Sequence, residues 1–322
     1  MATKKPSPAW RERLARAGTY REAFSFDPAR IKHPSAGWVA MFQEEFGMTD
    51  ADFRVPVSQG DDAVSLDGRP GIDPAHRAAM EKIVGEDNVD DSDYARVRFG
   101  HGKTVDENLA LRAGRVAAVP DLVVHPRDKE DVSAIVAYCV EHTIPVIPYG
   151  AGSGTVLGTR ADSGGVVLVM RTHMNKLLAI NERNMTAVVQ PGLIGSEFEA
   201  LLNEAPTRFG TNRAFTCGHF PQSFEMASVG GWIAALGSGQ ASTYYGDAYD
   251  LVVSQEYVTP VGTIRTRDFP ASATGPKVND ILKGSEGTFG VLVEATVKIF
   301  RYQPENTQRF AFMFPHWEAA VE

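Results

Sequence analysis

The sequence predicts an α+β protein in which two α/β subdomains follow one another along the chain. Two observations indicate this class. From Pro120 onward, short apolar runs typical of strands alternate with helical patterns, and this alternation begins again near Met185. Glycine-rich stretches follow the apolar runs in both units, where a backbone must turn sharply or approach a ligand closely. We expect the subdomains at about residues 117–180 and 183–302.

The composition is that of a globular protein. The chain has 322 residues, of which 43% are hydrophobic, enough for sizeable cores. Its net charge of −8, without a long basic run, argues against nucleic acid or an anionic membrane surface as the main partner. No stretch approaches the ~20 apolar residues of a transmembrane helix. Cys139 and Cys217 fit neither a disulfide framework nor a zinc site. We expect a cytoplasmic protein without a metal site.

Residues 1–93 are interpreted as an N-terminal extension. A short helix is predicted over residues 10–17. A second helix is predicted from Asp73 and Pro74, because aspartate is a preferred N-cap and proline a preferred first helical residue.

The first subdomain is predicted to contain three strands and one amphipathic helix. The strands cover residues 121–125, 144–147 and 166–170. Asp128 and Asp131 resemble a capping box at the start of the helix. Its apolar positions follow helical spacing: Val132, Ile135, Val136, Cys139 and Val140. Cys139 is therefore interpreted as a core residue.

The second subdomain begins with a predicted strand over residues 186–190, which the turn Pro191-Gly192 ends. Ser196 and Glu199 then resemble a capping box for the next helix. Residues 251–259 and 263–266 are predicted to form a hairpin, and residues 291–299 a further strand.

The stretch from Ile147 to Gly158 is predicted to bind an anion. It carries four glycines in nine residues, so its backbone N–H groups can form a nest around a ligand. A Rossmann fingerprint would require glycine where Thr155 or Leu157 stands. A Walker A loop ending in Gly102-Lys103-Thr104 would require glycine at Val97. Both alternatives fail, and a flexible surface loop remains the other interpretation.

Four stretches taken together resemble a known family. Pro148 to Thr155, Gln190-Pro191-Gly192, Ser228 to Trp232 and Gly284 to Gly290 are similar, in order and spacing, to the FAD-binding domain of the vanillyl-alcohol oxidase/p-cresol methylhydroxylase flavoproteins. Among these, residues 94–302 look most like alkyldihydroxyacetonephosphate synthase-like FAD-linked oxidases. The resemblance implies FAD as cofactor. Covalent attachment in this family uses a histidine or cysteine in the first loop, and this loop has neither, so we expect non-covalent FAD.

The resemblance also implies site residues. His219, in the loop Cys217 to Ser223, matches a catalytic histidine of the family, although a lone loop histidine is more often merely solvated. The implied cofactor-binding residues are Pro148, Tyr149, Gly150, Ala151, Gly152, Ser153, Gly154, Thr155, Pro191, Gly192, Pro221, Ser223, Ser228, Gly230, Gly231, Trp232, Glu286, Gly287 and Val293.

Residues 303–322 are interpreted as the start of a C-terminal cap, whose substrate half is missing from the sequence. A fragment, a truncated product or a separate cap-bearing chain would each account for this. The implied activity is flavin-dependent exchange of acyl for alkyl on dihydroxyacetone phosphate, in ether lipid synthesis. The alternatives are an FAD-dependent 2-hydroxy-acid dehydrogenase and an FAD-binding subunit without its own turnover. The expected partners are a small-molecule or lipid-phosphate substrate, and a homo-oligomer is possible.

Overall fold

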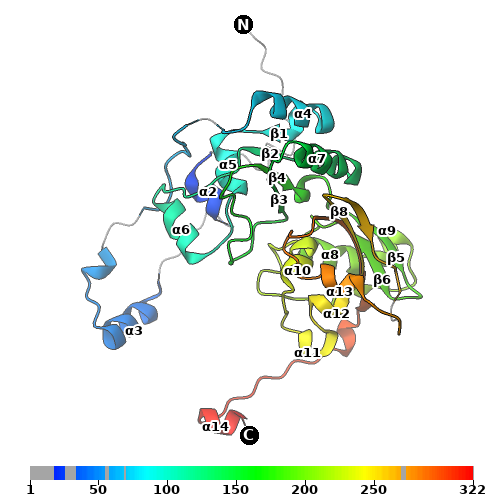
Figure 1. Ribbon diagram of the computed structural model, residues 1–322. Helices are drawn as coiled ribbons and strands as arrows, with labels where there is room; N and C mark the ends of the chain where they lie inside the picture. The colour runs from blue at the N-terminus through cyan, green and yellow to red at the C-terminus, as the bar shows by residue number, and fades with distance from the viewer. Residues whose placement is uncertain (1–17, 26–33, 55–57, 69, 270–272, 322) are drawn as a thin grey trace.

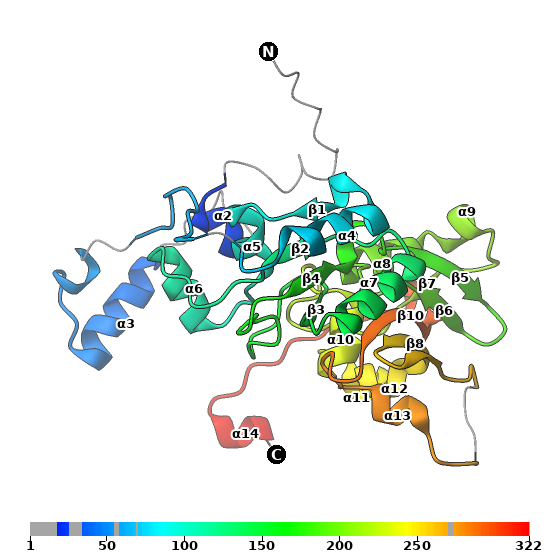
Figure 2. The ribbon, with the colours of Figure 1, turned by 45° about the horizontal axis from the view of Figure 1, so that its top comes forward.

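The computed structural model describes residues 18–25, 34–54, 58–68, 70–269 and 273–321. Two lobes, each with its own sheet, lie side by side (Figures 1 and 2). The α+β class and the two α/β units predicted from the sequence are confirmed. The helix predicted over residues 10–17 lies outside the described residues.

The first lobe has a four-stranded sheet in the order β1-β2-β4-β3. Its strands are β1 (Val89–Asp90), β2 (Leu122–Val124), β3 (Val146–Tyr149) and β4 (Val166–Val169). The strands β2, β4 and β3 are parallel, and β1 pairs antiparallel with β2. Helices α4 (Pro74–Val84) and α7 (Lys129–Glu141) pack on one face of this sheet, and α5 (Asp93–Phe99) packs on the other face. Helix α6 (Val105–Arg112) follows α5 in the chain. Thus α4 and β1, from the expected N-terminal extension, complete this lobe.

Local signals explain where the helices of the first lobe begin. The side chain of Asp73 accepts a hydrogen bond from the N–H of Ala75 at 2.8 Å, and Pro74 is the first residue of α4, as predicted. Asp128 caps α7 through the N–H of Asp131. The other half of the predicted capping box is absent, because the Asp131 carboxylate binds Arg127 instead.

The apolar stripe of α7 is buried at four of the five predicted positions, including Cys139. Burial raises the pKa of the Cys139 thiol to about 11, as expected for a core residue. Val140 is 49% exposed, because it lies at the edge of the helix face that meets the sheet. The prediction was wrong at this position.

The second lobe has a five-stranded antiparallel sheet in the order β5-β6-β10-β8-β9. Its strands are β5 (Leu177–Asn181), β6 (Thr186–Val189), β8 (Val252–Thr259), β9 (Gly262–Arg265) and β10 (Val291–Lys298). The predicted hairpin of β8 and β9 is confirmed. The helices are α8 (Gly195–Asn203), α9 (Ala205–Phe209), α10 (Val229–Ala235), α11 (Ser242–Tyr245), α12 (Ala248–Leu251) and α13 (Val278–Leu282). A small ribbon pairs β7 (Phe215–Thr216) with β11 (Phe300–Arg301).

Two expectations for this lobe need correction. β5 falls within the range expected for the first subdomain, but it pairs with β6, so the change of sheet lies between Val169 and Leu177. The N-cap of α8 is Ile194, whose side chain cannot accept a hydrogen bond, so Ser196 does not cap this helix. The Glu199 carboxylate accepts instead from the backbone N–H of Cys217 at 2.8 Å.

The two lobes share part of their cores. Val258, Val291 and Val293 of the second sheet belong to the cluster of buried side chains beneath α4 and α7. An ion pair at 3.0 Å between Lys129 of α7 and Glu256 of β8 adds a polar contact at this junction. The lobes are therefore held in one arrangement by apolar packing.

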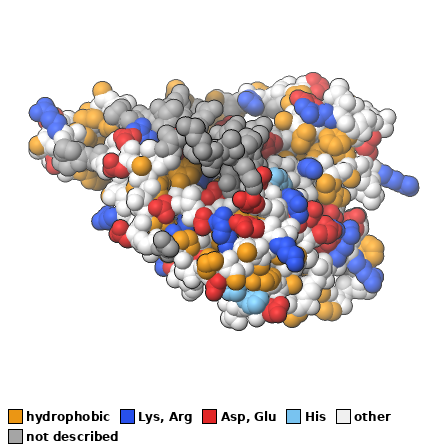
Figure 3. All heavy atoms as spheres, turned by 90° about the horizontal axis from the view of Figure 1, so that it is seen from above, with side chains coloured by type: hydrophobic (Ala, Val, Ile, Leu, Met, Phe, Trp, Pro, Cys, Tyr) orange, Lys and Arg blue, Asp and Glu red, His pale blue; other side chains and the backbone are white. Residues whose placement is uncertain are grey.

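The remaining described elements are α2 (Tyr20–Phe24), α3 (Ala36–Phe46), α14 (Trp317–Val321) and 3₁₀ turns at Asp52–Arg54, Glu86–Asn88, Met170–Thr172 and Pro304–Asn306. Helices α3 and α14 project away from both lobes and bury none of their side chains (Figures 1 and 2). Acidic and basic side chains are interspersed on the face seen in Figure 3. Within the described ranges, no helix has the length and apolar character needed to cross a membrane.

Candidate functional site

The loop between β3 and β4 presents a series of free backbone donors. Among the residues that the structure describes, no acceptor meets the N–H groups of Ala151, Gly152, Ser153, Gly154 or Thr155. Gly152 has φ +66°, a conformation that glycine adopts without strain. Consecutive N–H groups without protein acceptors form an anion-binding nest. The residues from Ala151 to Thr155 are called the nest below.

The start of α10 lies against Gly150, the residue that precedes the nest. Ser228 is the N-cap of this helix, and its Oγ accepts a hydrogen bond from the N–H of Gly231 at 3.2 Å. A Cβ atom added to Gly150 would lie 2.2 Å from the same Oγ. Glycine at position 150 is therefore what lets the end of β3 approach the start of α10.

The turn Pro191-Gly192 joins the same region. The N–H of Gly230 donates to the carbonyl oxygen of Pro191 at 2.9 Å, and a Cβ on Gly230 would lie 2.6 Å from the Pro191 Cβ. A Cβ on Gly192 would lie 2.5 Å from the carbonyl oxygen of Met170, just after β4. The paired glycines of α10 thus serve close backbone packing, and they bring the second lobe up to the end of the first sheet.

The loop before β10 lies on another side of β3. A Cβ on Gly287 would lie 3.3 Å from Cδ of Pro148, and a Cβ on Gly158 would lie 3.5 Å from Oε2 of Glu286. Pro148 and Gly287 also line a cavity of about 430 Å³ between the lobes, with Phe289 and Val291 on its wall. Segments from four parts of the chain therefore meet around the nest and β3.

Among the described residues, no predicted cofactor residue outside the nest makes a hydrogen bond to it, and four of them also lack the close backbone contacts given above: Pro221, Ser223, Trp232 and Val293. Pro221 and Ser223 form turns whose carbonyl groups accept from backbone N–H groups before α10. The Trp232 ring is buried in the core of the second lobe. The side chain of Val293 lies in the shared core, at a break in the β8–β10 register.

His219 is buried in the second lobe. Its side chain is 1% exposed, and neither ring nitrogen has a hydrogen-bond partner among the described residues. The ring meets Trp232 edge-on at 4.7 Å between centroids and faces a cavity of about 20 Å³, the size of a single water molecule. Burial lowers the pKa of His219 to about 4, although the carboxylate of Asp247 acts in the opposite direction. The imidazole is therefore neutral at pH 7.

The segment that carries His219 is anchored by α8. The Glu199 carboxylate accepts from the backbone of Cys217 and from the Thr216 hydroxyl at 3.1 Å. Burial raises the pKa of the Cys217 thiol, which donates to the carbonyl oxygen of His219 at 3.5 Å. Cys217 is therefore no thiolate nucleophile at neutral pH. In the described chain, no cluster of three or more histidine, cysteine or acidic residues could hold a metal ion.

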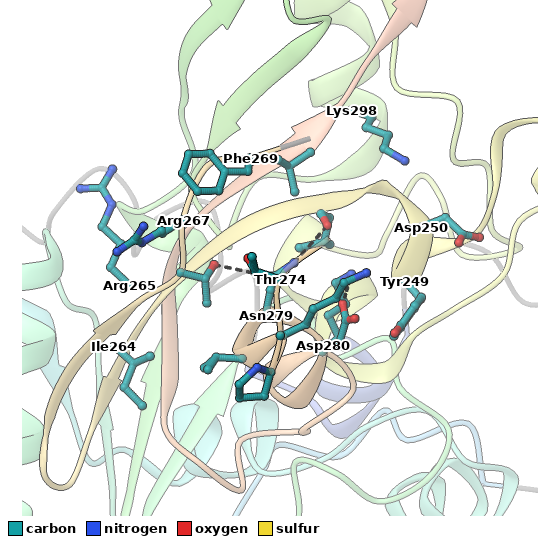
Figure 4. A pocket seen from close by; sticks show the side chains of 18 residues that line it. Tyr249, Asp250, Ile264, Arg265, Arg267, Phe269, Thr274, Asn279, Asp280 and Lys298 are labelled. Atoms are coloured by element: carbon teal, nitrogen blue, oxygen red, sulfur yellow. Dashed lines mark hydrogen bonds and ion pairs between the residues drawn. The ribbon is translucent and has the colours of Figure 1, made fainter. Parts of the chain in front are cut away.

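A larger cavity, of about 700 Å³, lies between α12, α13 and the β8–β9 hairpin (Figure 4). Basic residues outnumber acidic ones on its wall: Arg265, Arg267, Lys277, Lys283 and Lys298 against Asp250 and Asp280. Figure 4 shows Arg265 and Arg267 on one side of the cavity and Tyr249 and Asp250 on the opposite side. This cavity was not predicted from the sequence, because the residues that line it lie in separate segments of the chain.

Lys283 is the most enclosed cation of this cavity. Its side chain is 6% exposed, pairs with Asp280 at 2.9 Å and lies 4.2 Å from the centre of the Tyr249 ring. Arg267 makes no ion pair in the described part of the chain and lies over the ring of Phe269. The cavity therefore favours an anionic ligand.

The residues behind the nest were also not predicted from the sequence. Arg98 of α5 donates from Nη1 to the hydroxyl oxygen of Tyr149 at 3.2 Å, and that hydroxyl lies against Gly152. The segment from Gly100 to Thr104, rejected as a Walker A loop, contacts Gly154. The glycines of this segment can be read from the sequence, but its contact with Gly154 cannot.

Comparison with known proteins bears on this arrangement. Residues 120–267 match a family described as an FAD binding domain. The chain is 34% identical to alkyldihydroxyacetonephosphate synthase of Caenorhabditis elegans over 254 residues, which are 77% of this chain and 41% of the relative. It is 35% identical over 237 residues to the protein of the same name from Dictyostelium discoideum, which are 73% of this chain and 37% of the relative. The chain thus spans about two fifths of the length of these relatives.

Solved structures show the same fold. A structure of alkyldihydroxyacetonephosphate synthase matches with a TM-score of 0.67 and 32% identity, covering 74% of this chain and 42% of that one. A structure of p-cresol methylhydroxylase with substrate bound matches with a TM-score of 0.57 and 19% identity, over 73% of this chain and 45% of that one. The second match concerns the fold alone.

Proposed function

Because the chain carries the FAD binding domain of the FAD-linked oxidoreductases, we propose that it is an FAD-dependent enzyme that acts on a small anionic substrate. The first candidate reaction is that of its alkyldihydroxyacetonephosphate synthase relatives, exchange of an acyl for an alkyl group on dihydroxyacetone phosphate. The observation that carries the proposal is the nest of five N–H groups without acceptors in the described chain. A nest suits the diphosphate of a dinucleotide.

The residues around the nest fit FAD. Ala151 to Thr155 would hold the diphosphate, and the glycines at 150, 192 and 230 keep the surrounding backbone close enough to form a wall. We infer that Glu286 and Gly287 contact the remainder of the cofactor, because they lie next to β3 and line the gap between the lobes. Bound FAD would supply an electron-accepting ring for chemistry at the substrate carbon. No histidine or cysteine lies in the nest, so the binding is proposed to be non-covalent.

His219 is proposed as the catalytic base or hydrogen-bonding group. A neutral imidazole has one acceptor and one donor nitrogen, and here neither is used by another described residue. The cationic cavity beside α13 is proposed to bind the anionic end of the substrate. A phosphate or a carboxylate would each satisfy its charge.

Oxidation of a 2-hydroxy acid is the second candidate. Relatives with similar identity include a glycolate oxidase subunit of Bacillus subtilis, at 30% over 243 residues, and a mitochondrial D-lactate dehydrogenase [cytochrome] of Arabidopsis thaliana, at 29% over 315 residues. The same nest and the same cationic cavity would serve this reaction, so assays have to separate the two.

The first test is an absorption spectrum of the purified chain before and after acid precipitation. Flavin bands whose colour passes into the supernatant support non-covalent FAD, and a folded chain that takes up no added FAD refutes the proposal. Anaerobic addition of D-lactate or glycolate then separates the candidates, because only a dehydrogenase bleaches the flavin. Exchange of labelled fatty alcohol into acyl-dihydroxyacetone phosphate would support the first candidate. Bound FAD with neither response would leave an FAD-binding subunit.

A further inference from the structure

The side chain of Tyr149, the last residue of β3, lies directly against the nest. It is 1% exposed and belongs to the core between α5 and the first sheet. A Cβ added to Gly152 would overlap the Tyr149 hydroxyl oxygen, so this hydroxyl occupies the place that a side chain at position 152 would need. Gly152 is also the residue of the nest with positive φ. The hydroxyl of Tyr149 therefore contacts the nest at the residue where its backbone changes direction.

Arg98 of α5 holds this hydroxyl with two hydrogen bonds. Its Nη1 donates to the hydroxyl oxygen of Tyr149 at 3.2 Å, and the hydroxyl donates to the backbone carbonyl oxygen of Arg98 at 3.4 Å. Within the described chain the Arg98 guanidinium has no other hydrogen-bond acceptor and no acidic partner. Hydrogen bonds from a charged donor are stronger than those between neutral groups. The position of the Tyr149 hydroxyl therefore depends on Arg98.

The neighbours of Arg98 in α5 fix its position in turn. The Nε of Arg96 donates to the carbonyl oxygen of Pro120 at 2.8 Å, just before β2. The ring of Phe99 meets the ring of Tyr149 edge-on, with 5.3 Å between centroids. Both side chains are buried against the sheet. Arg98 thus reaches Tyr149 from a helix that is packed in place and not from a free loop.

The nest needs such a support because it is rich in glycine. The stretch from Ile147 to Gly158 contains four glycines, and glycine loses more conformational freedom on ordering than any other residue. Where a loop is not ordered beforehand, binding has to order it, and the affinity falls. The backbone N–H of Lys103 holds the carbonyl oxygen of Gly154 at 2.7 Å. The Tyr149 hydroxyl provides the contact at Gly152.

We propose that Tyr149 and Arg98 form a brace that holds the nest in its binding conformation before FAD arrives. The inference rests on the proposed function and gives a positioning role to Arg98, a residue outside the glycine-rich loop. Arg98 acts through the Tyr149 hydroxyl and not by contact with the cofactor. Loss of either group loosens the part of the site that holds the diphosphate, and it leaves the binding of the flavin ring unchanged.

The test is a titration of the flavin-free chain with FAD, followed by quenching of flavin fluorescence. Y149F removes only the hydroxyl, and R98M removes the group that holds it. Each variant should raise the Kd for FAD by about tenfold or more. Because Arg98 acts through the hydroxyl, the double variant should bind FAD no more weakly than Y149F alone. Riboflavin, which has no diphosphate, should bind the wild type and both single variants alike.

Y20F is the matched control. Tyr20 is also buried in the first lobe, and its hydroxyl likewise makes two hydrogen bonds, donating to the carbonyl oxygen of Ser65 at 2.9 Å and accepting from the Ser65 N–H at 3.4 Å. Y20F should bind FAD like the wild type. A Kd for FAD raised as much by Y20F as by Y149F would show a general loss of structure and would overturn the inference.

Three other results would also overturn the inference and leave the proposed function intact. One is an FAD affinity of Y149F equal to that of the wild type. Another is a double variant in which the two losses add, because Arg98 would then act without the hydroxyl. The third is an equal loss of affinity for FAD and riboflavin. If Y149F does not fold, an unchanged Kd of R98M for FAD would overturn it. A wild-type chain that binds no FAD would instead refute the proposed function.

Discussion

Replacing Gly154 with alanine separates ligand binding from folding at the nest. A Cβ at this position meets no atom within 4 Å, and the backbone of Gly154 is outside the positive-φ region. The folded chain can therefore accept the methyl group without strain. Because alanine also restricts the unfolded chain, we expect the free energy of unfolding to stay within about 0.5 kcal/mol of the wild type or to rise by up to about 1 kcal/mol.

The same methyl group would lie in open space within the nest, where we expect it to interfere with a bound diphosphate. Loss of one hydrogen bond to a charged oxygen costs about 1.5–3 kcal/mol. That loss corresponds to an FAD affinity lower by about 10- to 150-fold. Thermal unfolding of the flavin-free chain and fluorescence titration with FAD measure the two effects separately.

Gly37→Ala provides the control. Gly37 lies in α3, which projects away from both lobes, and its added Cβ has no neighbour closer than 4.0 Å. This variant should bind FAD like the wild type. If G154A also binds FAD like the wild type, the nest does not hold the diphosphate. The inference drawn from its unpaired backbone N–H groups would then be wrong.

Three further variants test other parts of the site. H219Q should retain bound FAD but lower turnover by about 100-fold or more, and equal turnover would exclude His219 from the chemistry. G230A should destabilise the chain by about 1–3 kcal/mol in denaturant unfolding, because its Cβ would meet Pro191 at 2.6 Å; an unchanged unfolding midpoint would show that the backbones separate easily. K103M should raise the unfolding temperature of the flavin-free chain at pH 6, and this gain should fade by pH 9. The pKa of Lys103 is about 10.5 in the unfolded chain and about 7 in the folded chain. Between these pH values the unfolded chain binds more protons than the folded chain, so the free energy of unfolding of the wild type rises with pH. A gain that does not change with pH would contradict the lowered pKa of Lys103.

The sequence alone determined the elements that depend on neighbouring residues. Asp73 and Pro74 start α4 because a cap and a fixed φ act within one turn of helix. The turn between β8 and β9 forms because Gly262 adopts φ +126° there. The order of the glycine-rich segments was sufficient to predict the FAD-binding domain, which the comparisons confirm.

Predictions failed where two local signals compete or where the partner lies far along the chain. Ser196 and Glu199 have the spacing of a capping box, but Glu199 binds Thr216 and Cys217, which lie near it because β7 packs on α8. The residues of β5 fell mostly within the range expected for the first subdomain, because nothing in them indicates that they pair with β6. Strand pairing is a contact between segments, so a strand by itself does not identify its sheet.

The site was decided by tertiary structure. The sequence determined that the residues at 150, 192 and 230 are glycines, but only packing shows that Ser228, Met170 and Pro191 fill the space a side chain would need. The contact between Lys103 and Gly154 spans 51 residues and cannot be read from either segment. The neutral state of His219 likewise follows from burial, which depends on every neighbour at once. Short-range geometry and hydrogen bonding act through the local sequence, whereas close approach and desolvation exist only when distant segments meet.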